Sequence, residues 1–245
     1  MNKPAPTTPA VELADVTKHY GNGVRALEKV TLRVPAGSIC ALVGPNGSGK
    51  STVLKLAAGL LEPTAGAVTI AGRPAGSTAA RAGIGYLPEA PDYPGWLGVR
   101  EFLEYCGILS GLEGAVLRDA IEARLEETGL AGLAERRAGT LSKGQRQRLG
   151  LAQALLHDPT VLLLDEPADG LDPHGMTAFA GLIGRWREAG RTVLLSSHFL
   201  PQVESLCDRA VLLHEGRVIW DGPPGAPGGL AERFVGLVPA DAAAR

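Results

Sequence analysis

The chain of 245 residues has few aromatic side chains, only three cysteines, no long apolar run and almost no net charge. Aromatic residues make up 4% of it and hydrophobic residues 45%, so we expect a core built mainly from leucine, valine and alanine. A formal charge of −2 weighs against a dedicated nucleic-acid binder, which is usually basic, and we expect no nucleic-acid partner. No apolar run approaches the roughly 20 residues that span a bilayer. We therefore expect a protein that is soluble by itself and reaches a membrane only through a partner.

The cysteines and the first residues favour a reduced, cytosolic protein. The cysteines are scattered without a C-x-x-C pair, at Cys40, Cys106 and Cys207. This spacing indicates reduced thiols and offers no zinc ligand cluster. Residues 1–10 are rich in proline and threonine and lack the apolar stretch of a signal peptide, so we expect a flexible lead.

Residues 44–52 match the phosphate-binding pattern G-x-x-x-x-G-K-S/T. The apolar run 38–43 before them predicts a buried strand, and the residues after them are apolar at helical spacing. Glycines let successive backbone N–H groups point at an anion, and the new helix adds the positive end of its dipole. The residues expected to bind a nucleotide here are Gly44, Pro45, Asn46, Gly47, Ser48, Gly49, Lys50, Ser51 and Thr52.

Four side chains near this loop have a specific predicted chemistry. Lys50 would reach the β- and γ-phosphates, and the Ser51 hydroxyl would ligate Mg²⁺. The apolar run 161–164 predicts a central parallel strand, and it ends in Asp165 and Glu166. Charge at the end of a buried strand is costly, so we expect these acids to serve Mg²⁺ and an attacking water. The alternative is that they cap a helix.

The remaining pattern predicts an α/β domain with a helical insertion. Strands are expected at 11–16, 27–34, 67–70, 84–87 and 192–197, with a hairpin at 209–214 and 217–220. Helical spacing runs from 99 to 138, and a further helix opens at residues 141–145. Ser142 is its expected N-cap, with Gln145 completing a capping box. Beyond Asp221 we expect a loose tail with a short amphipathic piece at 230–238.

Single residues at the ends of elements carry weaker signals. Tyr20 could stack on a flat base or be an ordinary strand-end residue. His198 follows a predicted strand, and a lone histidine at the end of a strand usually has no functional role. The proline-rich segment 89–98 predicts an irregular surface loop, whose Tyr93 and Trp96 either contact a partner or pack on their own loop.

The order of these motifs resembles the ATP-binding subunits of ABC transporters, over residues 11 to 220. Residues 44–52 look like the Walker A loop, 141–145 like the signature L-S-G-G-Q, and 161–166 like Walker B. Residues 169–172 look like the D-loop, His198 like the switch histidine and Tyr20 like the adenine-stacking aromatic.

Two residues depart from the family pattern. Lys143 stands where the signature usually has glycine, and Glu89 stands where the Q-loop normally has glutamine. Phosphate contact should survive the first change because Ser142 and Gly144 are kept. Glu89 could still ligate Mg²⁺, but it adds negative charge near the γ-phosphate. In having these two departures, Lys143 and Glu89, the sequence is similar to bacterial exporter ATPases of the type-2 permease group. This group includes gliding-motility and copper-site assembly ATPases.

The resemblance implies a fold with three parts. It implies a P-loop NTPase with a RecA-like core and parallel sheet, an antiparallel β subdomain and an inserted helical subdomain. The ATPase domain would span residues 11–220, with the helical insertion at about 89–160 and a C-terminal tail at 221–245.

The resemblance also implies an activity. ATP would sit between two subunits arranged head to tail, with Ser142, Gly144 and Gln145 of one subunit facing the γ-phosphate held by the other. The implied catalytic residues are Lys50, Glu166 and His198, the implied metal ligands are Ser51, Asp165 and Glu89, and the further nucleotide contacts are Tyr20, Glu89 and Asp172.

The implied partners are a second copy or a paralogous ATPase, and a separate transmembrane permease. This permease is expected to be that of an exporter and to hold the protein at the inner face of the cell membrane. Two alternatives stay open. One is a soluble ABC ATPase that acts on a cofactor-assembly or other macromolecular complex, and the other is a nucleotide-dependent regulator with little turnover.

Overall fold

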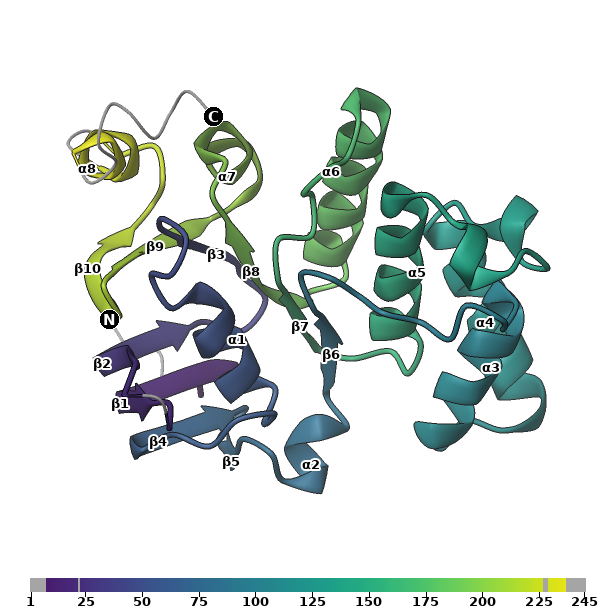
Figure 1. Cartoon of the computed structure of the whole chain (residues 1–245), viewed down its shortest axis with the longest axis horizontal. Helices are drawn as coiled ribbons and strands as arrows, with labels where there is room; N and C mark the ends of the chain where they lie inside the picture. Colours follow the sequence, from purple (N-terminus) through teal and green to yellow (C-terminus); the bar gives the residue numbers. More distant parts are fainter. Residues whose placement is uncertain (1–7, 22, 227–228, 237–245) are drawn as a thin grey trace, which may run out of the picture.

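The structure, a computed structural model, describes residues 8–21, 23–226 and 229–236. Two sheets lie side by side, and a group of helices extends from one edge of the larger sheet (Figure 1). Residues 1–7 of the expected flexible lead lie outside the described residues. Ala10, which we placed in that lead, is buried, and its N–H donates to the carbonyl of Val34 at 2.9 Å.

The smaller sheet is antiparallel and has the strand order β2-β1-β4-β5. Its strands are β1 (Val11–His19), β2 (Arg25–Val34), β4 (Ala65–Ile70) and β5 (Arg73–Pro74). The expected strands at 11–16, 27–34 and 67–70 are confirmed, although each extends further. Val11 and Leu13 are fully buried in a core that includes α1 (Lys50–Ala57).

The larger sheet has the order β10-β9-β3-β8-β7-β6. It is parallel from β9 to β6, and β10 joins its edge antiparallel to β9. The strands are β3 (Ile39–Val43), β6 (Ile84–Leu87), β7 (Val161–Leu164), β8 (Thr192–Ser197), β9 (Arg209–His214) and β10 (Arg217–Gly222). Both faces are covered, so a strand such as β3 is buried at every position.

Alternate side chains of β3 enter two different cores. Cys40 and Leu42 face the core that contains α1, whereas Ile39, Ala41 and Val43 face the other core. The helices of that second core are α6 (Pro173–Glu188) and α7 (Leu200–Leu206). A short helix, α2 (Thr78–Arg81), precedes β6.

The helical insertion has its own apolar core. It contains α3 (Val99–Leu109), α4 (Gly114–Glu127), α5 (Lys143–Leu155) and the 3-10 turns η1 (Ala131–Leu133) and η2 (Ala138–Thr140). The helical pattern expected up to residue 138 ends at Glu127, because Gly129 follows with φ of +68°. α5 begins at Lys143 with Ser142 as N-cap, as predicted.

Beyond Asp221 the structure has more regular structure than the loose tail that we expected, and the short amphipathic piece predicted at 230–238 is present as a helix. Asp221 and Gly222 continue β10, pairing with β9. α8 (Leu230–Val235) follows, with Leu230 fully buried in the second core and Phe234 packed against it. Residues 237 and 238 of the predicted amphipathic piece lie outside the described residues.

The two aromatic residues of segment 89–98 differ in environment. The Tyr93 ring lies edge-on to Phe102, with 4.8 Å between centroids, and its hydroxyl donates to the Arg146 carbonyl at 3.1 Å. Local packing therefore accounts for Tyr93. Trp96 is 74% exposed and is free to meet a partner.

Candidate functional site

The phosphate-loop residues connect β3 to α1, and two glycines are required there by close backbone approach. A side chain at Gly44 (φ +155°) would begin 2.2 Å from the Leu213 carbonyl oxygen. A side chain at Gly49 (φ +108°) would begin 2.8 Å from the Ala26 carbonyl oxygen. The loop is thus held against β9 and β2, with Asn46 and Gly47 on its exposed side.

Lys50 folds back over this loop. It is only 6% exposed, and its Nζ donates to the Gly44 carbonyl at 2.8 Å and lies 3.8 Å from Glu166 Oε1. Burial lowers the pKa of Lys50, while the charges of Glu166 and Asp165 act in the opposite direction. A buried ammonium group beside a curled backbone is a suitable partner for an anion.

Asp165 is buried and is held by two hydroxyl groups. Its Oδ1 accepts hydrogen bonds from Ser51 Oγ at 3.1 Å and from Ser196 Oγ at 2.7 Å. Ser196 also accepts from the Glu166 N–H at 2.7 Å. Ser196 was not among the predicted site residues. Its only signal in the sequence is a hydroxyl at the end of the apolar run 192–197.

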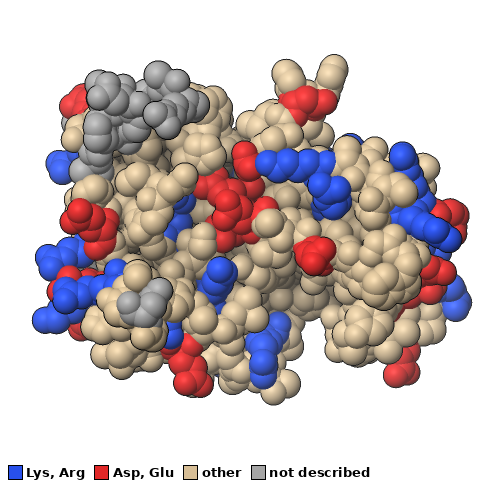
Figure 2. All heavy atoms as spheres, viewed as in Figure 1, with Lys and Arg blue, Asp and Glu red and all other residues tan. Residues whose placement is uncertain are grey.

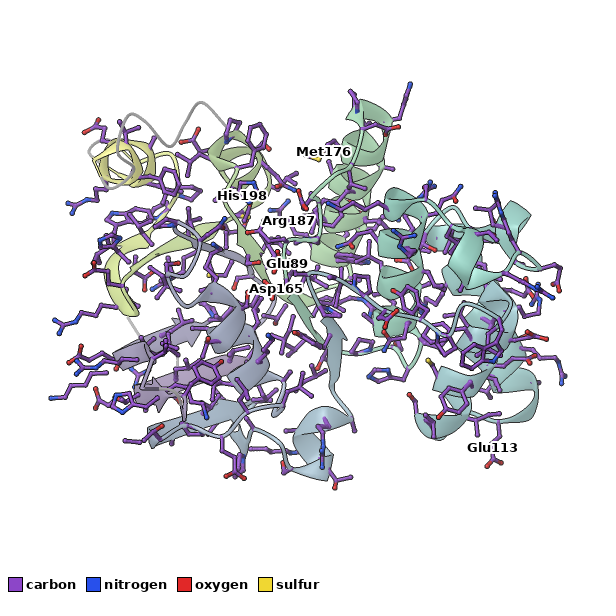
Figure 3. All side chains as sticks on the ribbon, in the orientation of Figure 1. Glu89, Glu113, Asp165, Met176, Arg187 and His198 are labelled. Atoms are coloured by element: carbon purple, nitrogen blue, oxygen red, sulfur yellow. The ribbon has the colours of Figure 1, made fainter. Side chains whose placement is uncertain are left out.

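Glu166 pairs with His198 across the ends of β7 and β8. His198 Nδ1 lies 3.0 Å from Glu166 Oε2, and the backbone of Glu166 has the left-handed φ of +45° that non-glycine residues rarely adopt. The helix-capping alternative is wrong for both acids, because α6 is capped by Asp172 instead. Figure 3 places Glu89, Asp165 and His198 in the middle of the molecule, and Figure 2 shows acidic side chains gathered there.

A cavity of about 440 Å³ lies beside the loop. Tyr20, Glu89, Glu166 and the residues 46–52 contribute to its wall. The Tyr20 hydroxyl lies 3.3 Å from Thr52 Oγ1, within hydrogen-bond distance. The structure therefore brings Tyr20, Glu89 and Glu166 together with most of the loop, although these residues are far apart in the sequence.

Besides Gly44 and Pro45 of the loop itself, four predicted nucleotide contacts do not line this cavity. Ser142 and Gln145 form the predicted capping box, in which Ser142 N–H donates to Gln145 Oε1 at 2.9 Å and Gln145 N–H donates to Ser142 Oγ at 3.3 Å. Gly144 lies between them at the start of α5. Asp172 Oδ1 accepts from the Gly175 N–H at 2.7 Å. Within one chain these residues have structural roles, and their contacts to nucleotide stay predictions.

Fold and site together define a P-loop nucleotide-binding protein, in which a glycine-rich loop joins a buried strand to a helix near paired carboxylates. The model of the ABC transporter family matches residues 27–169. The uncharacterized ABC transporter ATP-binding protein YxlF of Bacillus subtilis is 41% identical over 197 residues, which are 80% of this chain and 65% of YxlF. Nod factor export ATP-binding protein I of Rhizobium sp. is 36% identical over 229 residues, which are 93% of this chain and 74% of that protein.

Solved structures of ABC transporter cassettes also resemble this chain. MJ0796, described as a bacterial ABC transporter cassette, has been solved as a dimer; it is 27% identical, with a TM-score of 0.81 over 89% of this chain and 100% of that one. A dimeric post-hydrolysis state of MJ0796 bound to ADP and Pi matches with 28% identity and the same TM-score of 0.81. The chain belongs to the ABC transporter family, as an ATP-binding subunit.

The match to relatives is incomplete in length. The chain spans about two thirds of YxlF, 65%, and 74% of the Nod factor export protein. In the part of the chain that the structure describes, no helix is long and apolar enough to cross a bilayer.

Proposed function

We propose that this chain hydrolyses ATP with Mg²⁺ and drives a separate membrane permease. The observation that carries the proposal is the convergence of Lys50, Asp165 and Glu166 on the phosphate loop, beside a cavity large enough for a ligand. Tyr20, at the wall of the same cavity, offers an aromatic face for the adenine.

The residues present fit magnesium. Ser51 Oγ and Asp165 Oδ1 are 3.1 Å apart, and Glu89 lines the same cavity, so hard oxygen donors are available. Among the described residues there is no group of three or more His, Cys, Asp or Glu side chains that could hold a metal ion by themselves. Mg²⁺ is typically bound by one or two protein oxygens with phosphates and water completing the shell, which agrees with this donor set. When bound, the ion would neutralise charge on the phosphates.

The chemistry that the side chains support is phosphoryl transfer to water. Lys50 would exchange its bond to the Gly44 carbonyl for phosphate oxygens and offset the charge that develops on them. The Glu166 carboxylate would accept a hydrogen bond from the attacking water. His198, 3.0 Å from that carboxylate, would keep it oriented and contact the γ-phosphate.

A second subunit would complete the site. Ser142, Gly144 and Gln145 lie outside the cavity of their own chain, so they are available to the nucleotide of a partner arranged head to tail. The dimeric structures of MJ0796 support this arrangement. The partner would be a second copy of this chain or a paralogous ATPase.

The permease would dock on the helical insertion. Large apolar side chains are exposed on the segment before α3 and on α3 and α4, at Trp96, Tyr105, Ile108, Leu109 and Val116. Such a concentration is typical of interaction surfaces. The export function named for the Rhizobium relative supports an exporter. From the sequence resemblance we further propose that its permease is of the type-2 group and that this subunit lies at the inner face of the cell membrane.

Two measurements test this proposal. The first is phosphate release by the wild type and by Glu166→Gln: the wild type should turn over MgATP, and the variant should bind MgATP but release no phosphate. Turnover of Glu166→Gln at the wild-type rate would show that Glu166 does not activate the water.

The second measurement is a pull-down of the tagged chain from detergent-solubilised membranes. Recovery of a multi-span permease, lost when Leu109 and Trp96 are both replaced by glutamate, supports the transport function. Recovery of only a soluble complex would favour the non-transport ATPase instead.

A further inference from the structure

Lys143, the departure from the signature pattern, makes a defined contact. Its Nζ donates to Asp169 Oδ2 at 2.7 Å. Lys143 is the first residue of α5, and the first turn of this helix holds no acidic residue. A cation is unfavourable at the positive end of a helix, so the Asp169 carboxylate offsets both the lysine and the helix dipole.

The loop that carries Asp169 is shaped to receive the lysine. A side chain at Gly170, where φ is +71°, would begin 3.0 Å from Cδ, Cε and Nζ of Lys143. The lysine stem thus lies directly over Gly170. One residue further, a side chain at Gly144 would begin 3.8 Å from Leu171 Cδ2, which shows that the second residue of α5 also faces this loop.

The same loop leads back to Glu166. The Asp169 N–H donates to the Glu166 carbonyl at 3.1 Å, and Gln147 Nε2 of α5 donates to that carbonyl at 3.4 Å. The loop, residues 166–171, also borders a hollow of about 240 Å³ whose wall includes His198. The contacts with α5 therefore hold this loop, and a series of contacts leads from α5 through it to the Glu166–His198 pair.

We propose that Lys143 and Asp169 are a positioning pair that fixes the signature residues relative to Glu166 within one subunit. This inference rests on the proposed function, in which Ser142 and Gly144 serve the partner's nucleotide and Glu166 serves the subunit's own. A tie between them links the geometry of the two nucleotide sites of a dimer. Because neither side chain of the pair lines the cavity beside Lys50, the pair acts on turnover and not on nucleotide binding.

A set of substitutions at the two positions tests the proposal. Lys143→Ala and Asp169→Ala should each lower kcat about two- to fivefold, the effect of losing an exposed ion pair, with the Kd for MgATP unchanged. The double variant should be no slower than either single one, because both remove the same contact. Lys143→Arg should retain the wild-type rate, and the exchange of the two charges, Lys143→Asp with Asp169→Lys, should recover most of it.

A matched control lies on the antiparallel sheet. Arg33 and Glu12 form an exposed ion pair with Nε and Oε1 2.8 Å apart, and Arg33→Ala should leave kcat unchanged. The proposal is overturned if Lys143→Ala keeps the wild-type kcat, if the two single effects multiply in the double variant, or if Lys143→Arg is as slow as Lys143→Ala.

A second readout does not depend on hydrolysis. Hydrogen exchange of the backbone amides of residues 166 and 168–171 should be about two- to fivefold faster in Lys143→Ala than in the wild type. Unchanged exchange overturns the positioning pair. If the wild type releases no phosphate but Lys143→Ala still exchanges faster than the wild type, the proposed ATPase function is contradicted and the positioning pair is supported.

Discussion

Replacing Ser196 with alanine removes one hydroxyl that bonds both the Asp165 carboxylate and the backbone N–H of Glu166. Its Oγ donates to Asp165 at 2.7 Å and accepts from the Glu166 N–H at 2.7 Å, in a residue that is 0% exposed. A hydrogen bond to a charged group contributes about 1.5–3 kcal/mol, and a buried N–H left unsatisfied costs about 1–3 kcal/mol. Because the carboxylate keeps its bond from Ser51, we take the lower part of these ranges and expect about 3 kcal/mol in total.

Thermal unfolding measures this loss. In a chain of this size 1 kcal/mol shifts Tm by about 2–4 °C, so Ser196→Ala should melt about 6–12 °C below the wild type. The control is Ser110→Ala, which removes an exposed hydroxyl that donates to the Cys106 carbonyl and should change stability by less than about 0.5 kcal/mol. Equal melting temperatures for Ser196→Ala and Ser110→Ala would refute the role of Ser196.

Three further predictions concern stability and reactivity. Leu230→Ala removes a fully buried side chain of α8 and should lower the free energy of unfolding by about 2–5 kcal/mol, as measured with denaturant. Val235→Ala, at a position that is 70% exposed, is the control and should be near neutral. Equal effects of the two changes would show that α8 is not packed. Glu127→Ala leaves Trp186 Nε1, which donates to it at 3.0 Å, without its acceptor and should cost about 1–3 kcal/mol, while the exposed neighbour Glu126→Ala serves as control. Burial raises the pKa of Cys106 to about 11 and that of Cys207 to about 12, and it also raises the pKa of Cys40. At pH 8 the native thiols should therefore react slowly with iodoacetamide and the unfolded chain rapidly at all three, as read by mass spectrometry; rapid labelling of Cys40 in native protein would contradict its burial.

The parts of the site that the sequence predicted are those with local rules. The phosphate loop has its glycines and lysine within nine consecutive positions. The acids Asp165 and Glu166 directly follow a uniformly apolar run. The capping box of Ser142 and Gln145 depends on residues three apart, and the structure has both of its hydrogen bonds.

The parts that could not be predicted depend on the order of strands in space. Ser196 and Asp165 are 31 residues apart in the sequence, and they meet only because β8 pairs with β7. The pairing of Lys143 with Asp169 requires the start of α5 to lie beside the loop after β7. The amphipathic pattern predicted a short piece at 230–238 but not its packing: a six-residue helix such as α8 is marginal by local propensity and forms because Leu230 enters the core.

The central claim is that residues 44–52 bind the phosphates of a nucleotide, and calorimetric titration of MgATP tests it most directly. The wild type should bind MgATP, and Lys50→Ala should bind at least about tenfold more weakly, because it loses the buried ammonium group that we place against the phosphates. Lys55→Ala, at an exposed position on α1, is the matched control and should bind like the wild type. Equal affinity of Lys50→Ala and the wild type would contradict the account.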